Sequence, residues 1–216
     1  MREKCELCDK NESEYVIQLK SETELDVCDG CCFKLDKIFI EFIKVDGRNF
    51  NIEMINKLKR IIELCPDRDS GIIEIGAGLG LLGYYLDKAG YRDYTSIDLA
   101  TANACQTYFL SKNLPERNII ISGDIQNPFD LTYKDSLKIL HSTDFISIPK
   151  DRFKIMINID SFPEMIITEI NKYASSDCTK LLLSINTCDV ISPYRKKLYK
   201  TIFNLRDGYF EELFIL

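Results

Sequence analysis

A glycine-rich turn that directly follows a short apolar strand is the feature that most constrains the fold of this 216-residue chain. The stretch Ile72-Ile-Glu-Ile-Gly-Ala-Gly-Leu-Gly-Leu-Leu-Gly83 passes from strand-like residues into glycines, and Leu81, Leu82, Tyr85 and Leu86 then repeat at helical spacing. Because glycine has no Cβ, the backbone can approach a ligand closely where the N–H groups of a helix start face it. The pattern predicts an α/β sheet with a ligand at this turn.

Two glycine signatures overlap in this stretch, and they favour different ligands. From Gly78 the residues spell G-x-G-x-x-G, which is typical of dinucleotide sites; from Glu74 they spell E-x-G-x-G-x-G, which is typical of nucleoside-binding methyltransferases. A dinucleotide fingerprint should begin directly after the strand, at Gly76, but its sixth position is then Leu81. We therefore favour the signature that begins at Glu74 and continues through Gly76. A dinucleotide site and a turn without a ligand are the alternatives.

An acidic residue ends the next strand-like run. Tyr94–Ile97 is followed by Asp98, whose carboxylate can accept hydrogen bonds from both hydroxyls of a ribose. Both dinucleotide sites and nucleoside-binding methyltransferases require such a residue. Asp98 therefore predicts a bound nucleoside but does not distinguish the two kinds of cofactor.

With Glu74, the glycines and Asp98 in this order, residues 70 to about 190 resemble the class I S-adenosylmethionine (SAM)-dependent methyltransferases. The resemblance implies a Rossmann-like, three-layer α/β sandwich with SAM as the cofactor. The cofactor-binding residues that it implies are Glu74, Gly76, Ala77, Gly78, Gly80, Asp98, Leu99, Ser142, Thr143 and Asp144.

Two stretches compete for the third strand of this sheet. The run 141–153 has the spacing that the family uses between its adenine-contacting loop and its fourth strand, Phe153–Asp160, so we favour Leu137–Leu140. The alternative, Asn118–Asp124, has a more typical distance from the second strand but lies too far from the fourth. The favoured choice makes residues 118–135 an insertion.

The segment Asn158–Met165, after the fourth strand, is the most distinctive in the chain. Together with Thr95–Leu99 and Gln106–Ser111, it resembles a bacterial family assigned to sugar O-methyl transfer. This resemblance implies a small-molecule acceptor and, more narrowly, a hydroxyl group on a sugar.

Methyl transfer to an alcohol needs an aligned hydroxyl and a base that takes its proton. We predict that Asp160 or Glu164 is that base or binds the acceptor, and that Asn158 and Ser161 orient the acceptor. The structural alternative makes Glu164 an early helix residue and Asp160 a cap at the strand end. The single histidine, His141, is expected in a structural or adenine-side position.

Two pairs of cysteines lie near the start of the chain. Cys5 and Cys8, and then Cys28 and Cys31, form C-x2-C pairs separated by nineteen residues, a spacing typical of a structural Zn²⁺ site with four thiolate ligands. Cys32 could replace Cys31 as the fourth ligand. Four reduced cysteines in a small core, or two redox-active pairs, are the alternatives.

The residues around these cysteines predict a treble-clef or ribbon-like zinc module. Tyr15–Leu19 and Leu25–Val27 are typical of a hairpin, and apolar residues from Leu35 to Ile43 then repeat at helical spacing. A segment this short buries too little apolar surface to fold without a structural metal ion or another cross-link. We assign residues 1–45 to the zinc module and residues 46–216 to the methyltransferase domain.

The charge of the chain argues against a nucleic-acid partner. The formal net charge is −6, no Lys/Arg-rich run stands out, and residues 1–36 contain five Lys or Arg against ten Asp or Glu. No apolar stretch reaches the roughly 18 residues of a membrane span, and nine cysteines occur without a secretory signal. We therefore predict no membrane partner, a cytoplasmic location and a protein-contact role for the zinc module.

The remaining elements predict how the domain begins and ends. Asn51 to about Leu64 should be a helix, Lys180–Ile185 a fifth strand, and Ser192 to about Phe203 a second helix. Only residues 208–216 then remain for the antiparallel pair that usually closes the family's sheet. Either the sheet is one strand short or another chain completes it, which favours a homo-oligomer or a partner chain at this edge.

Two classes of function remain open. The first is an enzyme that moves a methyl group from SAM to a hydroxyl of a sugar or another small molecule. The second is a SAM-binding or protein-methylating chain whose zinc module docks a partner protein.

Overall fold

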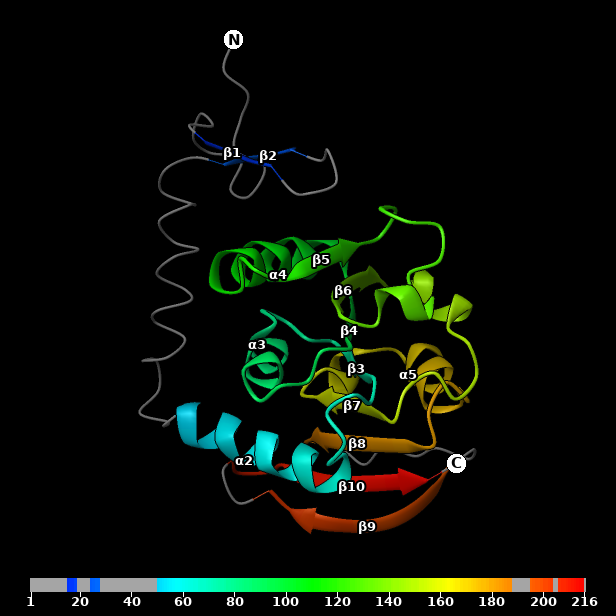
Figure 1. The fold of residues 1–216 in the computed structure, drawn as a ribbon. Helices are drawn as coiled ribbons and strands as arrows, with labels where there is room; N and C mark the ends of the chain where they lie inside the picture. Colours follow the sequence, from blue (N-terminus) through cyan, green and yellow to red (C-terminus); the bar gives the residue numbers. More distant parts are fainter. Residues whose placement is uncertain (1–14, 19–23, 28–49, 188–194, 204–205, 216) are drawn as a thin grey trace.

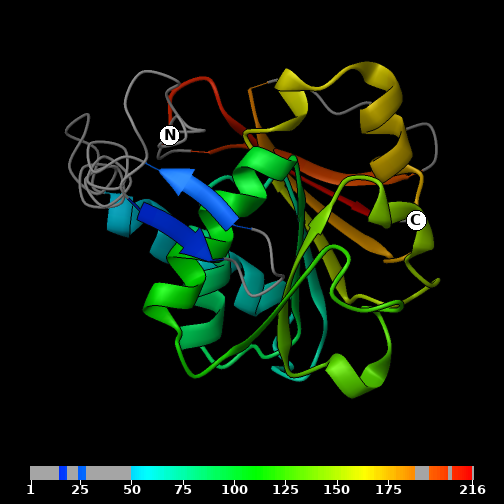
Figure 2. The same cartoon turned by 90° about the horizontal axis from the view of Figure 1, so that it is seen from above.

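The computed structural model describes residues 15–18, 24–27, 50–187, 195–203 and 206–215. An eight-stranded sheet lies at its centre, with helices on both faces (Figures 1 and 2). The strands of this sheet are β3 (Ile72–Ile75), β4 (Tyr94–Asp98), β5 (Asn118–Ile121), β6 (Ser136–His141), β7 (Ile155–Ile159), β8 (Leu181–Asn186), β9 (Lys196–Ile202) and β10 (Phe210–Ile215). The helices are α2 (Phe50–Leu64), α3 (Leu81–Lys88), α4 (Ala100–Asn113) and α5 (Ile167–Ala174), with short 3-10 helices η1 (Leu131–Tyr133), η2 (Asp144–Ser147) and η3 (Phe162–Glu164).

The order of the strands reverses direction beside the glycine turn. The order is β5-β6-β4-β3-β7-β8-β10-β9, and in this sheet β10 alone runs antiparallel to its neighbours. From β3 the chain moves outward to β4 and then to the edge strand β5. It comes back to β6, which lies between β5 and β4, and then crosses to β7 on the other side of β3. Open α/β sheets bind ligands beyond the carboxyl ends of the strands at such a reversal. The turn after β3 lies there.

Both faces of the sheet are covered, which explains why β3 is apolar at three of its four positions. Ile72 packs in a core with α2, α3 and α4, whereas Ile73 points to the opposite face and packs in a core with α5. Burying an isoleucine side chain stabilises the fold by about 1.5–3 kcal/mol. The buried exception is Glu74, which suggests a role other than packing.

Both stretches that competed for the third strand form strands. β6 pairs with β4 in parallel, which confirms the assignment of Leu137–Leu140 as the third strand. β5 pairs with the outer side of β6. The expected insertion at residues 118–135 therefore supplies an eighth strand at the edge of the sheet, an addition that spacing alone did not predict.

The helix predicted from Ser192 to about Phe203 is wrong, because Lys196–Ile202 forms strand β9. β9 pairs with β10, and Tyr199 packs beside the core beneath α2. This tertiary pairing overrides the local signals for a helix, because β9 provides hydrogen-bond partners for the backbone groups along the edge of β10. The chain itself therefore provides both strands of the closing pair, and the prediction of a sheet that is one strand short is also wrong.

The edge strand β9 carries features that hinder pairing with a second chain. Its sequence holds Lys196, Lys197 and Lys200, and the register with β10 shifts between Leu213 and Phe214. Lysines and irregular pairing are typical protections of an exposed sheet edge. Self-association at this edge stays a prediction, but the incomplete sheet that motivated it is not observed.

The N-terminal hairpin is present as predicted, with β1 (Tyr15–Gln18) antiparallel to β2 (Glu24–Val27). The helix predicted to end at about Leu64 is α2. The cysteines predicted as zinc ligands, Cys32 and the apolar run 35–43 lie outside the described residues, so the zinc module and its boundary at residue 45 stay predictions. Among the helices that the structure describes, none combines the length and the apolar character needed to cross a bilayer.

Candidate functional site

The loop after β3 is held in a backbone conformation that favours glycine and leaves room for a ligand. Gly76 and Gly78 have φ values of 72° and 57°. A Cβ on Gly76 would lie 2.1 Å from the Ser161 Oγ, whereas a Cβ on Gly78 would meet nothing within 4 Å. The loop is therefore packed against the protein at Gly76 and open in front of Gly78, and Gly80 then caps α3.

Asp98 stands at the end of β4 with its carboxylate against this loop. Its Oδ2 accepts hydrogen bonds from the Gly78 N–H at 2.9 Å and from the Gln106 Nε2 at 3.3 Å, and its Oδ1 accepts one from the Leu99 N–H at 2.8 Å. Burial raises the pKa of Asp98, and the N–H groups of Leu99, Gly78 and Ala77 oppose that rise. The adjoining Leu99 side chain is 64% exposed and presents an apolar surface beside the carboxylate.

Glu74 lies inside β3, directly below the glycine turn, and is only 4% exposed. The Tyr94 hydroxyl donates a hydrogen bond to its Oε2. Burial raises the pKa of Glu74 to about 7, although this hydrogen bond and the positive charge of Lys57 act in the opposite direction. Glu74 therefore does not face open solvent; it joins β3 to β4 beneath the loop.

Asn158 braces the glycine loop from the neighbouring strand. Its fully buried Nδ2 donates to the Ile75 carbonyl oxygen at 2.9 Å and to the Ser161 Oγ, while its Oδ1 accepts from the Asn186 Nδ2 at 2.8 Å. The Ser161 hydroxyl donates to the same Ile75 carbonyl at 3.1 Å. The described contacts make Asn158 and Ser161 positioning residues beneath the loop, and their predicted contact with an acceptor stays a prediction.

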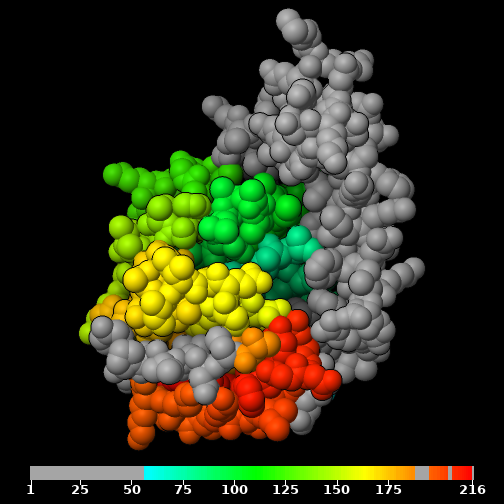
Figure 3. All heavy atoms as spheres, turned by 180° about the vertical axis from the view of Figure 1, so that it is seen from behind, coloured from blue at the N-terminus to red at the C-terminus, as the bar shows by residue number. Residues whose placement is uncertain are grey.

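Asp160 is held by the C-terminal part of the chain. The Arg206 Nη1 donates to its Oδ2 at 2.9 Å, and the Tyr209 hydroxyl donates to its Oδ1. The backbone of Asp160 has a φ of 65°, a region that costs most residues roughly 1 kcal/mol or more but that Asp tolerates better than most. Figure 3 shows the C-terminal residues, in red, lying against the segment after β7, in yellow. Of the two candidate bases, Asp160 is thus the one already engaged.

Glu164 ends η3 and is exposed, and it accepts no hydrogen bond from the residues that the structure describes. Its charge is close enough to Asp98 to contribute to the raised pKa of that carboxyl. The loop after β7 therefore brings a second carboxylate near Asp98.

The loop after β6 is folded around Asp144 at the same edge of the sheet. The Asp144 Oδ2 accepts hydrogen bonds from the Ser122 hydroxyl at 2.6 Å and from the His141 N–H at 3.1 Å. The His141 Nδ1 lies 2.9 Å from the Thr143 Oγ1, and the Ser142 carbonyl accepts from Lys172 of α5 at 3.3 Å. His141 pairs in register with Asp98, which confirms its predicted place at the end of the third strand.

Comparison with known proteins identifies the fold. No protein-family model and no curated protein sequence matches this chain. A protein from Pyrococcus horikoshii OT3 aligns over 81% of this chain and 98% of its own, with 10% identity and a TM-score of 0.56. A SAM-dependent methyltransferase from Aquifex aeolicus aligns over 85% and 96%, with 14% identity and a TM-score of 0.53. The fold is that of the class I methyltransferases. A mutant of MtNAS in complex with SAM also aligns, over 86% of this chain and 73% of its own, with 10% identity and a TM-score of 0.53.

Within this methyltransferase fold, the predicted residues of the glycine turn, Asp98 and the loops after β6 and β7 gather at one edge of the sheet. The contacts that sequence reasoning missed come from three places: Lys57 of α2 near Glu74, Gln106 of α4 on Asp98, and the C-terminal turn on Asp160. In the sequence Gln106 belongs to the run Gln106–Ser111 that carries a family resemblance, and that run does not predict a contact with Asp98. For the Asp160 contacts the sequence carries no local signal, since the donors lie 46 and 49 residues further along the chain.

The part of the chain that the structure describes holds no group of three or more His, Cys, Asp or Glu side chains arranged to bind a metal ion. The predicted ligands Cys5, Cys8, Cys28 and Cys31 are outside that part. Three described cysteines, Cys65, Cys105 and Cys178, are free thiols. Burial raises the pKa of each, which favours the neutral thiol and makes them poor nucleophiles and ligands.

Proposed function

We propose that this chain is a SAM-dependent methyltransferase that acts on a hydroxyl group of a small molecule, with sugars as the first acceptor class to test. The observation that carries the proposal is the convergence, at one edge of the sheet, of an open glycine loop, a carboxylate against that loop, and a second carboxylate free for an acceptor. These three features come from Gly78, Asp98 and Glu164.

The residues present fit a bound SAM molecule. The open space in front of Gly78 and the N–H groups at the start of α3 can receive the polar part of the cofactor. Asp98 can exchange its hydrogen bond with the Gly78 N–H for bonds to ribose hydroxyls, and the exposed Leu99 offers an apolar surface for a base. Ser142, Thr143 and Asp144 supply the polar side of the same region.

When bound, SAM would supply a methyl group on a positively charged sulfur; the hydroxyl oxygen would attack the methyl carbon, and S-adenosylhomocysteine would be the leaving group. In the proposed reaction Glu164 takes the proton of that hydroxyl, because it is the exposed carboxylate with no described hydrogen-bond donor. Asp160, held by Arg206 and Tyr209, keeps the loop after β7 in place. Asn158 and Ser161 hold the glycine loop against that same loop. We therefore assign the alignment of the acceptor to these two loops.

Calorimetry with SAM and S-adenosylhomocysteine, followed by a methyl-release assay over sugars and nucleotide sugars, tests the proposal. The wild-type chain should bind both cofactor forms, and Asp98→Ala should weaken binding by about tenfold or more through loss of charge-assisted hydrogen bonds. Glu164→Gln should retain SAM binding and lose most turnover. Glu116→Gln, which removes an exposed carboxylate away from this edge of the sheet, should leave turnover unchanged. No cofactor binding by the wild-type chain would refute the proposal.

The cysteine spacing favours a second role beside catalysis, which is structural zinc binding by the N-terminal segment. We propose Cys5, Cys8, Cys28 and Cys31 as ligands of one Zn²⁺ ion, with protein contact as the role of the acidic module around it. Metal analysis of the purified chain should give one zinc per chain, and Cys28→Ser should abolish it. If the chain binds SAM but methylates no small molecule, a protein acceptor docked through this module becomes the preferred alternative.

A further inference from the structure

Helix α4 places a buried amide against the glycine turn. Gln106 lies in the middle of this helix and is fully buried, as is Leu110 one turn further on. A Cβ on Gly80 would lie 3.3 Å from the Gln106 Cγ, so the aliphatic part of the side chain packs against the loop. The Gln106 Nε2 donates to the Asp98 Oδ2 at 3.3 Å. One side chain of α4 therefore contacts both the glycine loop and the carboxylate beside it.

The chemistry of Asp98 determines which way this amide points. An ionised carboxylate only accepts hydrogen bonds, so the amide nitrogen of Gln106 must face it and the amide oxygen must point elsewhere. That oxygen, Oε1, is buried and accepts no hydrogen bond from the residues that the structure describes. A buried acceptor without a donor lowers the stability of the folded protein. An apolar side chain of the same length would avoid this loss, so packing alone does not account for a glutamine at this position.

The other donors to the Asp98 carboxylate are backbone N–H groups. The Gly78 N–H donates to Oδ2 at 2.9 Å, and the Leu99 N–H donates to Oδ1 at 2.8 Å. Among the residues that the structure describes, Gln106 is thus the one side chain that donates to this carboxylate. If ribose hydroxyls take the place of the Gly78 N–H, the amide of Gln106 remains as the donor on Oδ2.

We propose that Gln106 is a positioning residue that presents the Asp98 carboxylate to the ribose of the cofactor. The inference rests on the proposed function, because it needs a nucleoside at the glycine turn. The Gln106 Nε2 and the Leu99 N–H hold one carboxylate oxygen each, and each oxygen keeps a lone pair for a ribose hydroxyl. Such preorganisation raises affinity, because the carboxylate is held in one orientation before the ligand arrives.

Gln106→Met separates this role from a structural one. The substitution keeps the length of the side chain but removes both the donor to Asp98 and the unpaired oxygen. SAM affinity, measured by calorimetry, should fall about tenfold through loss of a hydrogen bond to a charged group. Thermal unfolding without cofactor should occur at the same or a higher temperature, because the unpaired oxygen is gone. In a methyl-transfer assay the KM for SAM should rise by the same factor, with kcat unchanged.

A double-mutant cycle tests whether Gln106 acts through Asp98. In the Asp98→Ala background, Gln106→Met should change SAM affinity by no more than about twofold, because the carboxylate that the amide orients is absent. A tenfold loss in both backgrounds would show that Gln106 acts independently of Asp98 and would overturn the inference.

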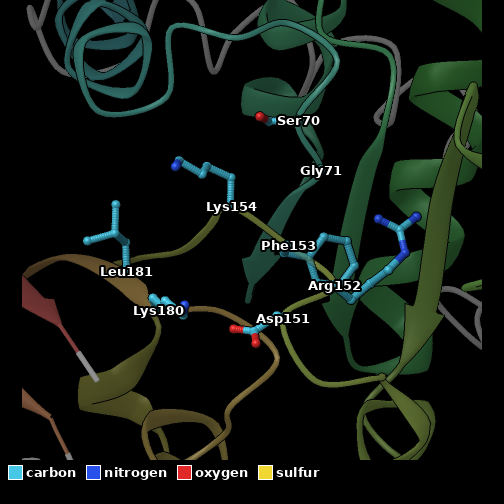
Figure 4. Close-up of a pocket in the computed structure, with 8 residues that line it drawn as sticks. All are labelled: Ser70, Gly71, Asp151, Arg152, Phe153, Lys154, Lys180 and Leu181. Carbon is cyan, nitrogen blue, oxygen red and sulfur yellow. The ribbon is translucent and has the colours of Figure 1, made fainter.

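Two control variants should leave SAM affinity unchanged. Thr107→Val removes a buried hydroxyl from the same helix, but this hydroxyl donates to the Asn103 carbonyl oxygen at 2.8 Å and not to Asp98. Lys154→Gln changes an exposed side chain in an open hollow of about 440 Å³, which lies where β3, β7 and β8 begin (Figure 4). The glycine turn follows the opposite end of β3, so this hollow is separated from it by the length of that strand, roughly 13 Å.

The outcomes distinguish this inference from the proposed function. If the wild-type chain does not bind SAM, the proposed function is refuted and the inference with it. If the wild-type chain binds SAM and Gln106→Met binds it equally tightly, the inference alone is overturned. A lower unfolding temperature of Gln106→Met, together with a raised KM and a reduced kcat, would mark a structural role and would also overturn it.

Discussion

Replacing Glu74 with glutamine should change how the stability of the protein depends on pH. Burial raises the pKa of Glu74 from an ordinary value of 4.5 to about 7 in the folded protein. Between these two values the folded protein keeps a proton that the unfolded chain has already released. The free energy of unfolding therefore falls as the pH rises through this window, because deprotonation favours the unfolded state.

The size of this effect follows from the shift. Each pKa unit corresponds to about 1.4 kcal/mol, so a shift of about 2.5 units destabilises the protein by about 3 kcal/mol once the pH exceeds 7. Between pH 5 and pH 8 the loss should be about 2–3 kcal/mol. Glu74→Gln keeps the shape of the side chain and an acceptor for the Tyr94 hydroxyl but cannot ionise, so it should lack this loss.

Urea unfolding of both proteins at pH 5, 6, 7 and 8 measures the difference. Circular dichroism is the suitable probe, since the chain has no tryptophan. The stability of Glu74→Gln relative to the wild type should increase by about 2–3 kcal/mol from pH 5 to pH 8. Glu116→Gln, which removes an exposed carboxylate, is the control and should follow the wild type. Parallel curves for wild type and Glu74→Gln would show that Glu74 is not held protonated by burial.

Four further substitutions test the site and its packing. Gly76→Ala should abolish SAM binding and destabilise the chain, because its Cβ would collide with Ser161. Gly78→Ala has open space for its Cβ and should lower the free energy of unfolding by about 1 kcal/mol, from its backbone conformation alone. Comparable SAM affinities of the two variants would contradict this reasoning. Gly83→Ala should lower the free energy of unfolding by about 1–3 kcal/mol, since its Cβ would lie 2.6 Å from the Tyr94 ring, and thermal unfolding measures this loss. Arg206→Gln should slow methyl transfer while leaving the SAM affinity measured by calorimetry unchanged, and a matching loss of affinity would instead place Arg206 at the cofactor.

Much of the sheet edge that carries the glycine turn could be predicted, because the residues that specify it are neighbours in the sequence. The strand before Gly76, the glycines and the helix after them are contiguous, and the glycines adopt the backbone conformation for which that residue type is suited. Asp98 was predictable as the residue that ends the second strand. Glu74 was predicted as a cofactor residue from the pattern, but its burial under the loop and its bond to Tyr94 depend on the sheet register.

The end of the domain could not be predicted in the same way. Ser192 and Pro193 are typical of a helix start, yet the chain continues into β9, because β10 offers an unpaired edge that no local pattern reveals. The contacts of Asp160 were likewise not predictable, since they come from Arg206 and Tyr209, which reach Asp160 from the turn between β9 and β10.

The sequence by itself determined the class of fold, the glycine loop, and the residue types at the ends of β3, β4 and β7, because backbone conformation and strand periodicity act over a few residues. Only the tertiary structure decided that Asp160 is engaged by Arg206 and how Asn158 braces the glycine loop. Those outcomes depend on the pairing of strands that are distant in the chain, and the free energy of such contacts is set by burial and geometry that no short window of residues contains.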